Sequence, residues 1–176
     1  MKKFSPIDNV NVYDNVFPLQ QQQDIFTFCR GSKFLIVGWN DLMNTTEGYI
    51  HSDWSKEDLE SSKFFDTKNT KRILSDNKLS MDNFSRCVVN TDTLSDSHWS
   101  HTHDETVVLY YLNTEWQDGW GGETLFYDED NKEIIYGSRF TPNRTVVFDG
   151  RIPHNIKHQN RIADKYRMSL SVFFKN

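Results

Sequence analysis

The sequence predicts a mainly β fold with flanking helices, on the basis of three observations. Short hydrophobic runs separated by turns recur from Arg86 to the C-terminus, at a spacing typical of a β-sandwich or barrel. Helical periodicity is confined to the first half of the chain. Aromatic residues make up 14% of the 176 residues, which favours β-rich packing around a pocket. We therefore expect a single domain over 1–176, with helical support over about 1–85 and a β core over about 86–176.

The first half contains three candidate helices and one candidate strand. The segment PLQQQQDIFTFCRG begins with Pro18, which suits a helix start, and ends with Gly31, which suits a C-terminal cap. KFLIVGW, residues 33–39, is expected to form a buried strand. Ser55 and Asp58 have the spacing of a capping pair at the start of a second helix. The segment NTKRILSDNKL indicates a third helix.

The second half predicts a series of short strands. They are expected near residues 86–91, 97–103, 106–113, 123–128, 133–137, 144–149 and 166–174. The sequence therefore predicts two or three helices packed on a small β-barrel.

The composition excludes several classes of protein. Hydrophobic residues make up 36% and charged residues 26%, which is ordinary for a soluble chain, and the net charge of -5 argues against a general nucleic-acid surface. We find no apolar run long enough to span a membrane, and no secretory signal at the start. Cys29 and Cys87 lack CxxC spacing and are expected to be free thiols in a reducing cytoplasm. These features predict a cytoplasmic protein that does not bind membranes or nucleic acids in general.

Three of the six histidines stand together in SHWSHTHDETVVLYYLN, residues 97–113. His101 and His103 are two residues apart, so on a strand both side chains face the same way. The segment VVFDGRIPHNI supplies His154 at the end of another predicted strand. Three ligands with open coordination positions suit redox iron chemistry or Lewis-acid catalysis. The three histidines are therefore candidate metal ligands.

The last predicted strand carries a second candidate site. In KYRMSLSVFF, Arg167, Ser169 and Ser171 share one face of the strand. A buried arginine costs free energy unless a carboxylate meets it. A bidentate arginine flanked by hydroxyls would bind the distal carboxylate of a small dicarboxylic acid. Alternatively, Arg167 pairs with an internal Asp or Glu, or lies at an exposed edge.

The segments LYYLNTEWQDGWGGETLFYD, FTPNRTVVFDGRIPHNI and YRMSLSVFF resemble the Fe(II)- and 2-oxoglutarate-dependent oxygenases, specifically the prolyl 4-hydroxylase-like family. The resemblance runs from about His98 to the C-terminus, with the motifs in the same order. It implies a double-stranded β-helix, which is a jelly-roll or cupin-like barrel, with iron at its open end. It also implies that the protein is a dioxygenase.

The resemblance assigns roles to several residues. His154 matches the distal iron-binding histidine, and Arg167 matches the basic residue that pairs with the distal carboxylate of 2-oxoglutarate. Tyr111, Thr124 and Ser171 fall where the family lines the same pocket. The implied reaction is hydroxylation of a protein side chain, prolyl by resemblance, or of a small molecule, with release of succinate and CO2. The implied cofactors are Fe(II) and 2-oxoglutarate, with ascorbate as a candidate reductant.

The first histidine motif departs from the family pattern. The family has His-x-Asp, whereas here His103 stands two residues after His101 in place of the aspartate. Two triads are open: His101, His103 and His154, or His103, Glu105 and His154, which keeps one carboxylate. The first is favoured because it leaves Asp104 and Glu105 as a short turn before the next strand. Since three histidines resemble cupin dioxygenase sites, two alternatives stay open. One is a cupin-type dioxygenase or isomerase that does not use 2-oxoglutarate, and the other is a non-catalytic metal-binding module.

Overall fold

The computed structural model describes residues 1–37, 49–92 and 99–176, and in this part of the chain the strands form two antiparallel sheets. The larger sheet has the spatial order β1 (Lys2–Ile7), β2 (Val10–Asp14), β9 (Arg144–Asp149), β6 (Thr106–Tyr111), β11 (Arg167–Phe174), β5 (Phe84–Asp92), β4 (Tyr49–Trp54) and β3 (Leu35–Val37). The smaller sheet has the order β10 (His154–Ile156), β7 (Thr124–Tyr127) and β8 (Ile134–Ser138). The predicted β core over 86–176 thus contributes strands to both sheets.

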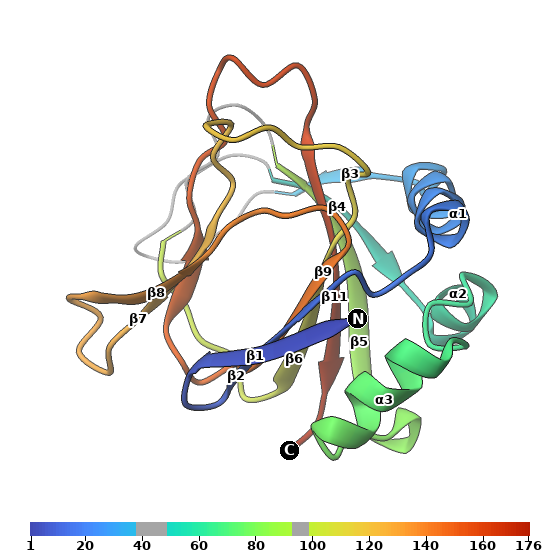
Figure 1. Ribbon diagram of the computed structural model, residues 1–176, viewed down its shortest axis with the longest axis horizontal. Coiled ribbons are helices and arrows are strands. Elements are labelled where there is room, and N and C mark those ends of the chain that lie inside the picture. The colour runs from blue at the N-terminus through green and yellow to red at the C-terminus, as the bar shows by residue number, and fades with distance from the viewer. Residues whose placement is uncertain (38–48, 93–98) are drawn as a thin grey trace.

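The helices cover one side of the larger sheet. They are α1 (Leu19–Arg30), α2 (Lys56–Ser61) and α3 (Lys68–Asp76), followed by the short 3-10 helix η1 (Met81–Asn83). Figure 1 shows α1, α2 and α3 on one side of the larger sheet, with β7 and β8 on the other. None of the helices in the described ranges is long and apolar enough to cross a membrane.

The predicted helix boundaries are confirmed by the capping contacts. Pro18 directly precedes α1, and Gly31 follows its last residue. At α2, the backbone N of Asp58 donates to Ser55 Oγ at 3.1 Å, and the backbone N of Ser55 donates to Asp58 Oδ2 at 2.9 Å. This reciprocal pair is a capping box, which satisfies two backbone donors at the helix start.

Strand β11 separates two hydrophobic layers. Its side chains at Met168, Leu170 and Val172 belong to the layer that includes Ile25 of α1 and Ile73 of α3. Because successive residues of a strand point to opposite faces, Arg167, Ser169 and Ser171 are directed toward the smaller sheet. The predicted alternation of this strand is confirmed, and it places polar groups between the two sheets.

The predicted strand over 97–103 is wrong where it can be compared with the structure. Residues 93–98 lie outside the described ranges, and Trp99 and Ser100 are not part of a strand. His101 forms only an isolated bridge with His154, with reciprocal N–O distances of 3.0 Å. The pairing does not continue as a strand because the backbone N of His103 donates to the carbonyl of Gly150, at 2.8 Å, instead of to a residue next to His154.

The first 85 residues supply strands as well as the predicted helical support. Strands β1 and β2 form a hairpin whose turn holds Asn9 at a positive φ of 59°. Val12 of β2 lies opposite Val146 of β9, so the hairpin extends the larger sheet. The predicted strand over 33–39 is shorter in the structure, where β3 covers Leu35–Val37 and the residues after it lie outside the described part. That the chain folds as a single domain stays a prediction.

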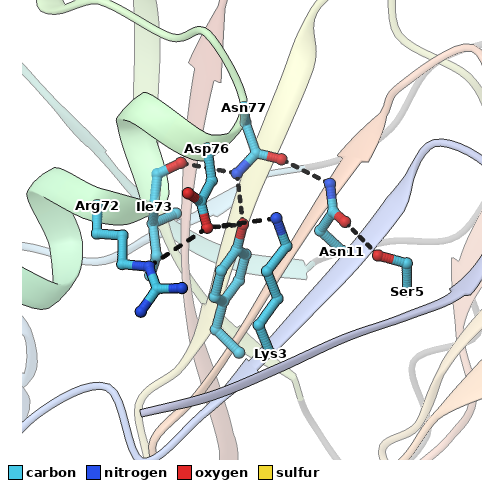
Figure 2. Close-up of polar contacts among 8 residues, drawn as sticks. Lys3, Ser5, Asn11, Arg72, Ile73, Asp76 and Asn77 are labelled. Carbon is cyan, nitrogen blue, oxygen red and sulfur yellow. Dashed lines mark hydrogen bonds and ion pairs between the residues drawn. The ribbon is translucent and has the colours of Figure 1, made fainter.

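A group of polar contacts fastens this hairpin to the end of α3 (Figure 2). Asn77 Nδ2 donates to the hydroxyl of Tyr13 at 2.9 Å and to the carbonyl of Ile73 at 2.7 Å. Asn77 Oδ1 accepts from Asn11 Nδ2 at 2.8 Å. Lys3 Nζ lies 3.3 Å from Asp76 Oδ2 in the same group. Asn77 therefore connects the hairpin with the helix through both atoms of its amide.

We expect Asn77→Ala to lower the free energy of unfolding by about 1–3 kcal/mol, because it leaves partly buried hydrogen-bonding groups without their partner. Urea unfolding measures this change. Lys3→Met is the matched control, since it removes an exposed ion pair in the same group and should cost at most about 1 kcal/mol. Equal losses in the two variants would contradict the role given to the Asn77 amide.

Candidate active site

Three histidines from two chain segments meet at one end of the space between the sheets. One potential ligand atom from each of His101, His103 and His154 lies within 4.8 Å of the others. The centroids of the His101 and His154 rings are 4.6 Å apart, and those of His101 and His103 are 4.9 Å apart. The bridge between His101 and His154 and the turn at Gly150 hold the two segments together. The structure thus brings together the favoured sequence-predicted triad.

Backbone carbonyls orient two of these imidazoles. Nδ1 of His101 lies 3.1 Å from the carbonyl oxygen of Trp99, and Nδ1 of His154 lies 2.7 Å from that of Ile152. Because a carbonyl oxygen only accepts, each Nδ1 carries the proton, and each Nε2 keeps a lone pair for a metal ion.

Burial keeps the imidazoles of His103 and His154 neutral. Burial, followed by the charge of the neighbouring His101, lowers the pKa of His154 to about 3. Burial, followed by His101 and Arg86, lowers the pKa of His103 to about 4. Because both pKa values lie well below 7, both side chains are neutral at neutral pH. Neutral imidazole is the form that binds metal ions.

The carboxylate of Glu105 contacts residues at the start of β5. Its Oε1 accepts from Ser85 Oγ at 3.2 Å and lies 3.5 Å from Nε of Arg86. Among the described residues, the group that could hold a metal ion contains His103 but not Glu105. The neighbouring Asp104 is exposed, as expected for a turn residue. The geometry thus favours His101 over Glu105 as the third member of the candidate triad.

A cavity of about 140 Å³ extends from the histidines between the two sheets. This volume is close to the roughly 150 Å³ that accommodates a benzene-sized ligand in a protein core. Besides the three histidines, its lining consists of Arg86, Val88, Asn90, Val107, Leu109, Thr124, Phe148, Asn155, Ile156, Ser169, Ser171 and Phe173. Hydroxyl and amide groups thus alternate with apolar walls around a space for one small molecule.

Arg167 lies fully buried behind this lining. Its Nε donates to the carbonyl of Gly122 at 2.9 Å, Nη1 lies 3.3 Å from Ser169 Oγ, and Nη2 lies 3.5 Å from Thr124 Oγ1. The guanidinium carbon lies 4.9 Å from the centroid of the Phe140 ring. Ser169 and Thr124 therefore connect the guanidinium with the cavity that they line.

Tyr111 completes this polar network. Its hydroxyl donates to Thr124 Oγ1 at 2.9 Å, and its ring stacks on Phe140 with a centroid distance of 4.5 Å. Thr124 Oγ1 also lies near Nη2 of Arg167, and Ser169 lies opposite Tyr111 in the pairing of β11 with β6. The structure thus brings Tyr111, Thr124, Arg167 and Ser169 together, and Ser171 lines the same cavity.

Gly121 and Gly122 both have positive φ angles, of 76° and 81°, which glycine adopts readily. A Cβ atom at Gly122 would lie 3.0 Å from Cδ of Arg167, so the glycine allows the arginine to pack against the turn. Trp116 Nε1 donates to the carbonyl of Gly121 at 3.0 Å, as expected for a tryptophan beside this turn.

Several site residues could not be found from the sequence. Gln159 Oε1 accepts from the backbone N of Arg167 at 2.8 Å, and Phe140 packs on both Arg167 and Tyr111. Arg86 and Phe173 line the cavity beside His103. Gln159 and Arg86 lie outside the quoted motifs, and Phe140 and Phe173 lie within them but give no sequence signal of a role in the site.

The remaining described histidines lie outside the cluster. The sequence offers no partner for His51, which suggests a surface position, but the side chain is buried, with Nε2 3.5 Å from Asp53 Oδ2, because β4 is an inner strand of the larger sheet. His158 is exposed, and His98 lies outside the described residues. Trp99, Arg139 and Arg151, which the sequence offers as candidates for a substrate-facing rim, are all exposed. Arg139 pairs with Asp118 and Arg151 with Asp149 on the surface.

Two facing sheets with this strand order form a double-stranded β-helix, and the histidine cluster with the buried arginine is typical of metal-dependent oxygenases of that fold. The family model described as the 2OG-Fe(II) oxygenase superfamily matches residues 80–175. The chain therefore belongs to this superfamily, and it is an enzyme of the oxygenase class. Membership favours the 2-oxoglutarate reading over the cupin-type and non-catalytic alternatives.

Solved structures confirm the fold. An oxidoreductase of the 2OG-Fe(II) oxygenase family from Burkholderia pseudomallei has a TM-score of 0.73 and 13% identity, covering 95% of this chain and 85% of that chain. A Pseudomonas putida prolyl-4-hydroxylase has a TM-score of 0.70 and 17% identity, with coverages of 96% and 93%. A Trichoplax adhaerens prolyl hydroxylase, in complex with a hypoxia inducible factor peptide fragment, has a TM-score of 0.69 and 16% identity, with coverages of 96% and 84%. No curated protein matches the chain.

Proposed function

We propose that His101, His103 and His154 hold Fe(II), and that Arg167 with its hydroxyl neighbours holds 2-oxoglutarate, in an enzyme that hydroxylates a prolyl side chain of a peptide. One observation supports these roles above all. The histidines line the same small cavity as Ser169 and Thr124, which contact the guanidinium of Arg167. The histidines therefore line the cavity directly, and the guanidinium lies behind two hydroxyl residues of the same cavity.

The residues present fit the implied metal ion. Imidazole nitrogen is a suitable ligand for iron, and the carbonyl contacts of His101 and His154 leave their Nε2 atoms available. All three ligands are neutral, so the bound ion keeps its full positive charge, which favours a dianionic keto acid. When bound, Fe(II) and 2-oxoglutarate would supply, with O2 as the oxidant, the chemistry that places one oxygen atom on the substrate and the other in succinate, with release of CO2.

The protein contributes binding, orientation and exclusion of water. Arg167 offers a fork of N–H donors to the distal carboxylate of 2-oxoglutarate. The hydroxyls of Ser169, Thr124 and Tyr111 can rotate to donate to the same carboxylate. Apolar walls, which include Leu109 and Phe148, keep water from the keto acid. A bound cofactor is thereby held in one orientation with respect to the histidines.

The proposed substrate is a peptide that contains proline. Two structural neighbours are a prolyl-4-hydroxylase and a prolyl hydroxylase in complex with a peptide fragment. Of the cavity residues, Arg86 is exposed, and five are partly exposed: Asn90, His101, His103, Asn155 and Ile156. A peptide approaching at this side would place a prolyl ring beside the metal. Ascorbate as reductant and a cytoplasmic location belong to the same proposal.

With Fe(II), O2 and 2-oxoglutarate, we expect the enzyme to form succinate, and proline-containing peptides to stimulate its formation. Succinate is measured by NMR, and peptide hydroxylation by a mass gain of one oxygen atom. The matched control is the same peptide set with alanine in place of proline. Tight metal binding without succinate formation in any mixture would contradict the proposal and favour a metal site that does not use 2-oxoglutarate.

A further inference from the structure

One guanidinium connects His103 with the carboxylate that the sequence offered as a competing ligand. Arg86 lies over the Phe173 ring, with its guanidinium carbon 3.7 Å from the centroid. Its Nη2 is 3.4 Å from Nδ1 of His103, and its Nε is 3.5 Å from Oε1 of Glu105. Ser85 Oγ contacts the same carboxylate oxygen at 3.2 Å. We call Arg86, His103 and Glu105 the arginine bridge.

The bridge sets His103 apart from the other two histidines. A guanidinium has only N–H donors, so Nδ1 of His103 acts as the acceptor and the proton is on Nε2. In His101 and His154 the arrangement is the reverse, because their Nδ1 atoms face carbonyl oxygens. A neutral imidazole that binds a metal ion through Nε2 carries its proton on Nδ1 and needs an acceptor there. Arg86 cannot be that acceptor.

We propose that Glu105 is the positioning residue for His103, and that its carboxylate accepts the hydrogen bond from Nδ1 of His103 when Nε2 binds the metal ion. The proton moves from Nε2 to Nδ1, so the charge of the imidazole does not change, and Arg86 releases the ring. The proposal rests on His103 being a ligand, as stated under the proposed function. The site would then have a carboxylate–histidine–metal arrangement. The negative charge of Glu105 would act on the metal ion through the imidazole of His103, without a direct bond.

The backbone around the bridge suits such an exchange of partners. The backbone N of His103 donates to the carbonyl of Gly150 at 2.8 Å, and the N of Gly150 donates to the carbonyl of Glu105 at 3.0 Å. A Cβ atom at Gly150 would lie 2.4 Å from the carbonyl oxygen of Glu105, so only glycine allows this close approach. The turn that carries both side chains is thus fixed.

Only side chains need to move in this exchange. The side chain of Arg86 is 46% exposed, so its guanidinium can turn toward solvent, giving up its contacts with the Phe173 ring and Glu105. Glu105 is partly buried beside the same guanidinium and is two residues from His103. The carboxylate and Nδ1 of His103 thus contact the same guanidinium, and the carboxylate is the acceptor that could replace it.

The test is Co(II) binding to the full chain, read by its dissociation constant and its visible d–d spectrum. Glu105→Gln keeps the size of the side chain and its contacts with Ser85, and we expect it to weaken Co(II) binding by about 10–100-fold and to shift the spectrum. Arg86→Met removes the competing donor and should bind Co(II) at least as tightly as the unaltered protein. Asp104→Asn is the matched control, since it removes the same charge from the exposed neighbour and should change the dissociation constant less than about twofold.

Three results would overturn the inference. One is unchanged Co(II) affinity and spectrum in Glu105→Gln. Another is equal weakening in Glu105→Gln and Asp104→Asn, which would indicate only a change in net charge. The third is a loss in Arg86→Met as large as that in Glu105→Gln, which would make the bridge a structural clamp. His103→Ala distinguishes a failure of this inference from a failure of the proposed function. Normal Co(II) binding by His103→Ala would show that His103 is not a ligand, which contradicts the proposed three-histidine metal site. Thermal unfolding of each variant without metal verifies that it is folded.

Discussion

Arg167→Met is expected to weaken 2-oxoglutarate binding by at least ~30-fold while leaving metal binding intact, because truncating one partner of a buried charge pair costs about 2–5 kcal/mol. Methionine preserves much of the buried volume but removes the donors that face Ser169 and Thr124. Anaerobic titration of the Fe(II) protein with 2-oxoglutarate measures this through the visible metal-to-ligand charge-transfer band.

Two further variants sharpen that experiment. Arg167→Lys keeps the charge but loses the planar fork, so its affinity should lie between those of the unaltered protein and Arg167→Met. Arg139→Met is the matched control, because Arg139 forms an exposed ion pair with Asp118. A charge-transfer band with an unchanged midpoint in Arg167→Met would exclude the guanidinium from the cofactor pocket.

His154→Ala should weaken Fe(II) binding by more than ~100-fold, since loss of a ligand is expected to exceed the 10–100-fold effect of losing a partner of a ligand. His154 is the most buried member of the triad and is fixed by the carbonyl of Ile152. Iron retained after anaerobic dialysis, or a calorimetric titration, measures the affinity. The charge-transfer band should disappear together with the metal.

The control for this prediction is His158→Ala, which removes an exposed histidine four residues further along the chain. It should retain iron as the unaltered protein does. Full iron retention by His154→Ala, with loss only in a different histidine variant, would move the metal centre away from the cluster.

Much of the β core could be predicted from local patterns, because hydrophobic periodicity directly reflects which face of a strand is buried. The alternation in RMSLSVFF placed Arg167 and Ser169 opposite Met168 and Leu170, and the structure confirms this. The hairpin at β1 and β2 was missed although VNVYD has the same alternation. Its first strand is short of hydrophobic residues, so its place depends on pairing with β9, which is distant in sequence.

The site was predictable in its residue types but not in its geometry. Spacing alone favoured His101 over Glu105 as a candidate ligand, and the structure agrees in clustering the three histidines. The direction of the Glu105 side chain depends on Arg86, which is held opposite Phe173 by the pairing of β5 with β11. Such a cross-strand relation links residues far apart in sequence, and no local pattern reports it. The same is true of Gln159 behind Arg167.

The position of β11 in the larger sheet has a consequence for biosynthesis. β11 follows the other described strands in sequence but lies between β6 and β5, which pair with it and not with each other. While the ribosome is still making the chain, these two halves of the sheet lack the strand that joins them. Sheets that depend on such distant pairings form slowly, and their unpaired strand edges are exposed to aggregation meanwhile. We therefore expect the nascent chain to depend on chaperones until β11 emerges, and the enzyme to acquire iron only after synthesis of that strand.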